Sequence, residues 1–485
     1  MAQNIGVRLL KGTLFTGSGN FLDKISSLLV FVVVVRLVSK DEVGAFVLVL
    51  LFAEILNIFN NLALDELGSA KMISSTADQK EVISCVALTS KFLISFLIIS
   101  LLMFSFPLFS RFFNLQHLNY SFLYVAFIFL SNCLIGMLLR ILQGWHKYKE
   151  IALAQSFLGL LRLCFAVIFV LIFDYGIYGL LNAYLSSYLI TVIILFYFLP
   201  FKYRPTWDYT VYKQLFLFGL PLGMNNGLTL IFNKVDRFLI TWMIGAAGLA
   251  VYETASKASQ NVRLLYNSFN YVFFPNISEL YSEERFREAE EILNNSIRVV
   301  SILSCFIALF THVFRFEITT LIFSKKYAEG APILSILTFA LCVALVSNLM
   351  GTSLVALGHS DKPIKANIVE AVTNIVANLI LIPAFGLIGA AFATILSRCA
   401  TNPVNFYFLR NANVAVKASQ YLMPLLVCGI IVALNSIISP TTVYLKICMV
   451  LIFPVACYAF SVIKKSDIVY IHSILKRMPR VLGST

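Results

Sequence analysis

Thirteen ionisable side chains lie within long apolar segments of this 485-residue chain. At about 3 kcal/mol for each charge facing lipid at the bilayer centre, they would cost on the order of 40 kcal/mol together. That exceeds the ~5–15 kcal/mol stability of an ordinary domain, so they must line water or pair with each other. The set comprises the basic residues Lys24, Lys91, Arg162, Lys234, Arg237, Lys257, Arg263 and Arg398, and the acidic residues Asp23, Glu54, Asp236, Glu253 and Glu370.

The eight basic residues exceed the acidic ones by three, which favours binding of an anion. A basic cleft with low-dielectric walls attracts phosphate or pyrophosphate, which Arg binds at two points and Lys as a point charge. We therefore expect the eight cations to bind an anionic group. Two alternatives stay open: Lys234, Asp236 and Arg237 form a local ion pair that fixes helix packing, and Lys91 and Arg263 extend toward an interface.

The carboxylates Glu54, Asp236 and Glu370 are candidates for ion coupling, because burial and neighbouring charges control their protonation. Asp236 has Lys234 and Arg237 beside it and is expected to stay ionised. Glu370 has no basic neighbour within one helical turn of it in its own predicted helix. The sequence therefore favours Glu370 as the proton carrier.

The elements that carry these residues are long apolar runs in a chain that is 59% hydrophobic and 13% charged. A bilayer core of ~30 Å needs about 20 apolar residues per helix, and barrel strands are much shorter. We predict an all-α polytopic membrane protein with about fourteen transmembrane helices. The runs are 14–37, 43–63, 82–106, 118–141, 151–173, 177–200, 215–242, 248–273, 296–322, 331–357, 364–384, 388–409, 420–438 and 442–463.

Loop charges predict the orientation of these helices. With both termini cytoplasmic, 22 of the 37 Lys and Arg residues fall in inner loops and seven in outer loops, as the positive-inside rule requires. The net charge of +13 then reflects mostly the Lys and Arg residues of the cytoplasmic loops, so no nucleic-acid partner is expected. A basic cytoplasmic tail is predicted over 464–485, where contact with anionic membrane lipid is an alternative role. The charged connection 274–295 is predicted to be an amphipathic surface helix.

Three segments of the chain recur at similar offsets. Residues 175–183 return as 385–393, residues 36–46 match 242–252, and residues 143–147 match 357–361. Duplication in a membrane protein indicates a transporter built from repeats. We predict parallel six-helix bundles over 1–200 and 214–410 around a central cavity, with two additional helices over 420–463.

Two of these segments carry a family resemblance. The residues Asp236, Arg237, Gly245, Tyr252 and Lys257, and the run 381–397, are similar to signatures of polysaccharide exporters. The chain resembles the O-antigen (Wzx-type) flippases of the multidrug/oligosaccharidyl-lipid/polysaccharide (MOP) superfamily, whose fold is MATE-like. The resemblance implies translocation of an undecaprenyl-pyrophosphate-linked oligosaccharide across the bacterial cytoplasmic (inner) membrane by alternating access. It further implies coupling to protons or sodium, and a partner in the polysaccharide polymerase machinery.

Polar amides at Asn57, Asn225, Asn226 and Gln260 are then expected to hydrogen-bond sugar hydroxyls. The sequence contains no phosphate-binding P-loop, no GxSxG and no HExxH motif, so we predict a transporter with no catalytic set, cofactor or metal site. The alternatives are a MATE-type drug or cation antiporter, which requires an acidic lumen, and a lipid II flippase. A membrane-embedded glycosyltransferase is disfavoured by the short outer loops.

Overall fold

The computed structural model describes residues 2–64, 66–75, 79–112, 121–260, 262–438, 442–460 and 462. Throughout these ranges the regular secondary structure is helical, which confirms the predicted fold class. All fourteen predicted runs overlap described helices, and nine described helices are long and apolar enough to span a bilayer. The count of fourteen spans stays a prediction, and the predicted tail 464–485 lies outside the described residues.

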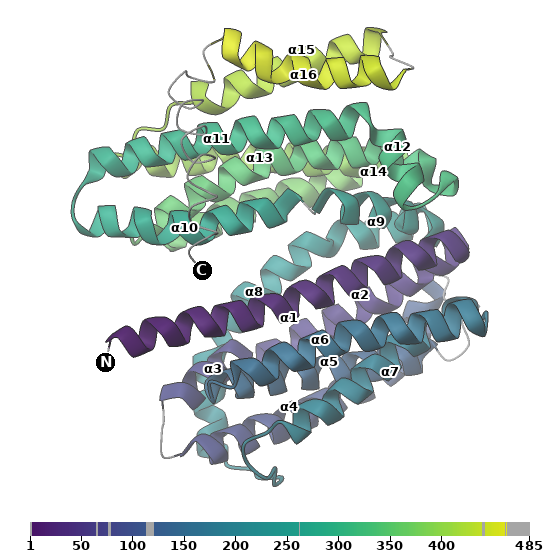
Figure 1. Ribbon diagram of the computed structural model, residues 1–485. Helices are drawn as coiled ribbons and strands as arrows, with labels where there is room; N and C mark the ends of the chain where they lie inside the picture. The colour runs from purple at the N-terminus through teal and green to yellow at the C-terminus, as the bar shows by residue number, and fades with distance from the viewer. Residues whose placement is uncertain are drawn as a thin grey trace, which may run out of the picture. The chain divides into compact units, whose positions relative to one another are not determined.

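The chain divides into two compact units, Met1–Val251 and Tyr252–Thr485. In the N-terminal unit α1 packs along α6, α5 along α7, and α2 along α8 (Figure 1). The ten-residue helix α3 was not predicted, because it is too short and too polar to form an apolar run. The helices of this unit are α1 (Ala2–Leu37), α2 (Lys40–Ala63), α3 (Glu66–Ser75), α4 (Lys80–Phe112), α5 (Ser121–Gly144), α6 (Tyr148–Ala166), the π-helix η2 (Val167–Ile172), α7 (Gly176–Tyr197) and α8 (Tyr209–Met243).

The boundary between the units falls within α9 (Ala246–Gln260). In the C-terminal unit α13 packs against α14 and α11, and the hairpin of α15 and α16 lies on α11 (Figure 1). The repeat boundaries 1–200 and 214–410 stay predictions, since they mark sequence duplication rather than compactness. The remaining helices are α10 (Val262–Ser282), α11 (Phe286–Val313), α12 (Arg315–Ile322), the 3-10 helix η3 (Lys325–Gly330), α13 (Ala331–Ala356), α14 (Asp361–Asn411), α15 (Ser419–Ile438) and α16 (Val443–Ala459).

The connection 274–295 is not a separate surface helix, and that prediction was wrong. Its charged residues extend α10 and α11, which meet at a tight turn around Glu284, where φ is 59°. The turn is closed by the Arg285 amide, which donates to the Leu280 carbonyl at 2.9 Å. The Arg285 guanidinium then donates to both Glu283 and Glu288, so the charges stabilise a turn rather than a new element.

The duplicated turns of the two units share a glycine with positive φ at the same position. Gly176 and Gly386 both have positive φ, at 52° and 60°, a conformation that Gly adopts without steric cost. Three residues later, Gly179 and Gly389 approach the carbonyl oxygens of Phe169 and Leu381. The first glycine of each copy therefore turns the chain, and the second allows the two helix ends to pack closely. In α14 this turn at Gly386 separates the predicted runs 364–384 and 388–409.

The third predicted repeat falls on two helix-ending turns of the same kind, whose register differs by two residues from the sequence match. The Lys147 amide donates to the Leu142 carbonyl at 2.8 Å, and the His359 amide to the Leu354 carbonyl at 2.9 Å. The residue before each donor, His146 or Gly358, has positive φ. The turns therefore align His146 with Gly358, whereas the sequence match had aligned Gly144 with it. The same turn also ends α10 at Glu284 and α14 at Asn413, so the third repeat stays a prediction.

Alanine at the second glycine of each turn should destabilise the protein. A Cβ would lie 2.6 Å from the Phe169 oxygen at Gly179 and 2.0 Å from the Leu381 oxygen at Gly389. We expect Gly179→Ala and Gly389→Ala each to lower the free energy of unfolding by about 1–3 kcal/mol. Thermal unfolding of the purified protein in detergent measures this. Gly429→Ala is the matched control, because a Cβ there has no neighbour within 4 Å. Wild-type stability of Gly389→Ala would contradict the close approach.

Candidate functional site

Four of the predicted carboxylates are ion-paired with four of the predicted cations. Each pair lies within one unit of the chain. In the N-terminal unit Asp23 pairs with Arg162, Glu54 with Lys234, and Asp236 with Arg237; in the C-terminal unit Glu370 pairs with Arg398. At least half of the predicted anion-binding cations therefore have carboxylate partners already.

Arg162 is the most enclosed of these four cations, with 4% of the residue exposed. Its Nη1 lies 3.1 Å from Asp23 Oδ1, and its guanidinium carbon lies 4.8 Å and 5.5 Å from the ring centroids of Tyr184 and Tyr188. Gly159 permits this approach, since a Cβ there would lie 2.8 Å from the Asp23 Cα. The arrangement joins α1, α6 and α7 through one charge, which suits a structural role.

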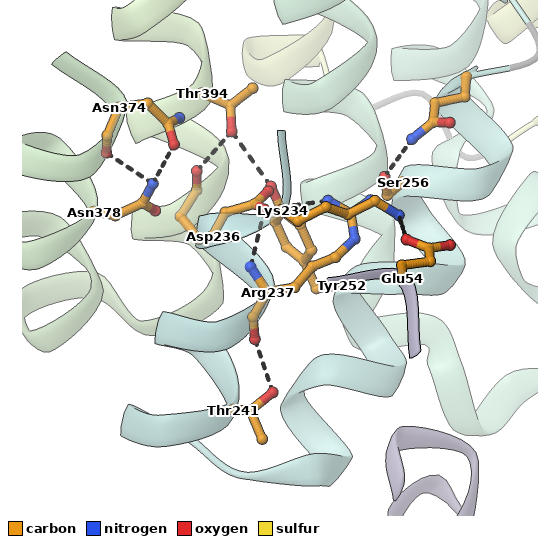
Figure 2. Close-up of polar contacts among 12 residues, drawn as sticks. Glu54, Lys234, Asp236, Arg237, Thr241, Tyr252, Ser256, Asn374, Asn378 and Thr394 are labelled. Carbon is orange, nitrogen blue, oxygen red and sulfur yellow. Dashed lines mark hydrogen bonds and ion pairs between the residues drawn. The ribbon is translucent and has the colours of Figure 1, made fainter. Parts of the chain in front are cut away.

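Helix α8 takes part in two ion pairs. Asp236 and Arg237 pair within the helix, and Lys234 pairs with Glu54 of α2. Lys234 Nζ lies 2.8 Å from Glu54 Oε2, and both side chains are partly exposed (Figure 2). Asp236 Oδ1 accepts from the Arg237 backbone amide at 2.9 Å and from its guanidinium at 3.1 Å. The expected local pairing of Asp236 and Arg237 is thus present. Lys234 points instead to Glu54 on another helix, where its charge is more accessible.

Glu370 has a basic partner, which corrects the premise that made it the preferred proton carrier. Arg398 Nη1 contacts Glu370 Oε1, and Thr401 Oγ1 donates to Glu370 Oε2 at 3.2 Å. The turn at Gly386 folds the two halves of α14 against each other, so Arg398 returns to Glu370 although 28 residues separate them. Arg398 lies beyond the turn at Gly386, so the residues next to Glu370 along its own helix give no sign of this partner.

The other four predicted cations differ in accessibility. Lys91 is fully buried, and its Nζ donates to Asn61 Oδ1 and, at 3.3 Å, to the Leu64 carbonyl at the end of α2. A cation at that position also complements the helix dipole. Lys24 and Arg263 are exposed and Lys257 is half-buried. Of the eight cations, Lys24 and Arg263 are the best placed in this conformation to meet a ligand.

The predicted sugar-binding amides have protein partners or lie outside the described side chains. Asn57 Oδ1 accepts from the Cys133 thiol at 3.2 Å, and the Gln260 amide donates to Ser256 Oγ at 3.0 Å. The side chains of Asn225 and Asn226 are not among those described. Their role in sugar binding stays a prediction.

A polar network in the C-terminal unit was missed by the sequence analysis. Asn378 is fully buried and donates to the Asn374 carbonyl and side-chain oxygens, at 2.8 and 3.0 Å. Asn374 donates to Ser397 Oγ at 3.4 Å. Thr394 Oγ1 lies 3.3 Å from the Tyr252 hydroxyl, as Figure 2 shows. The available signal was the spacing of these amides and hydroxyls three or four residues apart on apolar helices. Among the described residues, no group of three His, Cys, Asp or Glu side chains is placed to hold a metal.

The sequence profile of the polysaccharide biosynthesis protein family matches residues 33–332, well over half of the chain. The chain belongs to this family. That membership confirms the resemblance to polysaccharide exporters drawn from the repeat signatures.

Relatives of this chain include the capsular polysaccharide biosynthesis protein CapF of Staphylococcus aureus, 25% identical over 202 residues. This match covers 41% of the chain and 50% of CapF. The probable low-salt glycan biosynthesis flippase Agl15 of Haloferax volcanii is 26% identical over 180 residues, covering 37% of the chain and 38% of Agl15. The matches thus span half or less of these relatives.

Among solved structures, the lipid II flippase MurJ in an inward closed conformation has the same fold. The TM-score is 0.75 at 15% identity, and the match covers 93% of this chain and 100% of MurJ. MATE-family multidrug transporters of the MOP superfamily share the fold as well. The polysaccharide biosynthesis family member described here therefore has the predicted MATE-like fold of a multi-pass membrane transporter.

Removal of the buried Arg162 charge should destabilise the protein more than removal of a surface charge. Arg162→Gln would leave Asp23 without its cation in a largely apolar setting, at a cost of about 3 kcal/mol in the free energy of unfolding. Arg285→Gln breaks an exposed pair with Glu288, which solvent screens, and should cost much less. Thermal unfolding of the two variants side by side measures the difference. Equal, small losses would show that the Arg162 pair is not structural.

Proposed function

We propose that this protein is a flippase for an undecaprenyl-pyrophosphate-linked oligosaccharide, an O-antigen unit or a related surface-polysaccharide repeat. The carrying observation is that basic residues outnumber acidic ones, eight to five, among the thirteen ionisable residues of the apolar segments. Four of the five carboxylates each pair with one of the eight cations, and the exposed cations Lys24 and Arg263 lie outside these four pairs. An exposed cation in a low-dielectric setting favours an anionic ligand such as a pyrophosphate. Family membership supports the same cargo class.

Transport then proceeds by alternating access in the bacterial cytoplasmic (inner) membrane, with both termini cytoplasmic. The excess of Lys and Arg in the predicted inner loops supports this orientation. The polyprenyl tail stays in lipid while the glycan head group crosses. The polysaccharide polymerase machinery is the proposed partner on the outer side, where the repeat units are consumed.

The ion pairs suggest how transport is coupled to an ion gradient. The cations Lys234 and Arg398 are held by Glu54 and Glu370, and all four side chains are partly exposed. An arriving pyrophosphate competes with these carboxylates for their cations. A carboxylate that loses its cationic partner in a low-dielectric site favours its protonated form. Proton uptake at Glu54 or Glu370 would thereby accompany binding of the anion, with Asp236 held by Arg237 as a third candidate.

Two alternatives make different demands on the same residues. A MATE-type drug antiporter needs an excess of carboxylates to bind a cationic drug, and the pairing leaves cations in excess instead. A lipid II flippase would carry the same polyprenyl pyrophosphate with a different head group, and the fold shared with MurJ is compatible with it. The head group of the accumulated intermediate distinguishes these cargoes.

Deletion of the gene in its host should abolish the surface polysaccharide while undecaprenyl-linked oligosaccharide accumulates in the membrane. Plasmid-borne wild-type protein should restore the polysaccharide. Lipid extraction with mass spectrometry, together with surface glycan staining, measures both effects. Accumulation of lipid II would favour the second alternative. Loss of drug resistance with intact glycan would contradict the proposal and favour the antiporter.

Glu370→Gln should uncouple transport from the proton gradient, because glutamine can neither pair with Arg398 as an anion nor take up a proton. In proteoliposomes, transport by this variant should no longer respond to an imposed pH difference. Glu288→Gln is the matched control, since Glu288 is an exposed residue paired with Arg285 near the start of α11. Normal, gradient-dependent transport by Glu370→Gln would exclude Glu370 as the coupling residue.

A further inference from the structure

The connection between α7 and α8 carries exposed cations and exposed aromatic rings side by side. Residues 198–208 have no regular secondary structure. Lys202 and Arg204 are exposed, as is Lys213 in the second turn of α8. Trp207 is 53% exposed and Tyr209, the first residue of α8, is 67% exposed. We call these five residues the α7–α8 surface.

The backbone beneath this surface is fixed to the rest of the N-terminal unit. Thr89 Oγ1 of α4 lies 3.1 Å from the Tyr203 hydroxyl and accepts from the Thr206 amide at 3.2 Å. The Phe201 ring stacks on Trp145, just beyond the end of α5, with the ring centroids 5.6 Å apart. The connection is therefore held in place by both polar and aromatic contacts.

The side chains along this connection alternate between the protein and its surroundings. Successive residues of an extended chain point to opposite sides. Phe201 and Tyr203 make the contacts with the protein, whereas Lys202 and Arg204 are exposed. The packing of the aromatic residues thus fixes where the cations point.

The positive charge of the α7–α8 surface is in excess of the acidic charge near it in the sequence. Asp208 is the one acidic residue in 198–213, against three basic residues. Its carboxylate caps α8, accepting from two backbone amides of the first turn at 2.8 and 3.1 Å. No ion pair links the three cations to a carboxylate in the described part of the chain. The net charge of 198–213 is therefore about +2 at neutral pH.

We propose that the α7–α8 surface binds the head groups of anionic phospholipids at the membrane interface. Trp and Tyr rings favour the level of the head groups, and Lys and Arg beside them attract anionic lipid. The predicted orientation puts this connection on the cytoplasmic side, where the leaflet is negatively charged. A zwitterionic head group has no net charge to offer the cations. The assignment is independent of the cargo proposed above.

Bound lipid at this position has a consequence for α8. The helix begins at Tyr209, within the α7–α8 surface, and carries Lys234, Asp236 and Arg237 further along. Anionic lipid held at the start of the helix therefore fixes the depth of that end of α8 in the membrane.

Fluorescence quenching of Trp207 tests the assignment. The chain has three tryptophans, so Trp145→Phe with Trp242→Phe leaves Trp207 as the reporter, and Phe at 145 keeps a ring for the stack with Phe201. This full-length protein is reconstituted into mixed bilayers in which either phosphatidylglycerol or phosphatidylcholine carries brominated acyl chains. Brominated phosphatidylglycerol should quench Trp207 more strongly, and the preference should fall as salt is added, because salt screens exposed charges.

Two variants with equal charge changes separate local binding from net charge. The surface variant combines Lys202→Gln, Arg204→Gln and Lys213→Gln. Each cation near an anionic surface contributes about fivefold in affinity, so the preference for phosphatidylglycerol should fall by about tenfold or more. The matched control should keep the preference; it removes the same numbers of exposed Lys and Arg residues elsewhere, in Lys325→Gln, Arg410→Gln and Lys417→Gln.

Four results would overturn the assignment. Equal quenching by the two brominated lipids would show that the surface lies in lipid without selecting charge, and no quenching by either would show that it lies in water. A preference that salt leaves unchanged would exclude exposed cations as its source. A loss of preference in the control as large as in the surface variant would attribute it to net charge. Size-exclusion chromatography confirms that each variant is folded, and the salt dependence needs no change to the cations.

Discussion

The structure depends on how charge is accommodated within apolar helices. A single charge facing lipid costs a substantial part of the stability of a domain, so each needs a partner or water. The described structure meets this requirement by pairing Asp23, Glu54, Asp236 and Glu370 with nearby cations. Because the basic residues outnumber the acidic ones, the pairing leaves a positive surplus. Because the apolar helices hold more cations than carboxylates, an anionic cargo can supply the missing negative charge.

The paired charges fall into two groups with different consequences. Arg162 is enclosed by Asp23 and two tyrosine rings, and Lys91 is buried against the end of α2. Such groups hold helices together and are poorly placed to exchange partners. Lys234 and Arg398 keep partly exposed side chains beside partly exposed carboxylates. These pairs can open to admit another anion, which is the step that links binding to protonation in the proposed mechanism.

Much of the fold could be predicted from the sequence, because apolar length and duplicated turns are local signals. The segments around Gly176 and Gly386 showed the repeat, and the structure gives both glycines positive φ. The partners of the charges could not be predicted in the same way. Asp23 and Arg162 are 139 residues apart, and Glu370 meets Arg398 only because the chain reverses between them. The turn register after α5 was missed because His146 adopts a conformation that the other repeat assigns to Gly358.

The most direct measurement of the central claim is translocation in proteoliposomes that contain the purified protein and a fluorescent undecaprenyl-pyrophosphate-linked oligosaccharide. Accessibility of the glycan to an added glycosidase reports its arrival in the outer leaflet. The account predicts protein-dependent arrival that is lost when Lys24 and Arg263 are both changed to Gln, with the fold retained. Undiminished translocation by that double variant would contradict the account.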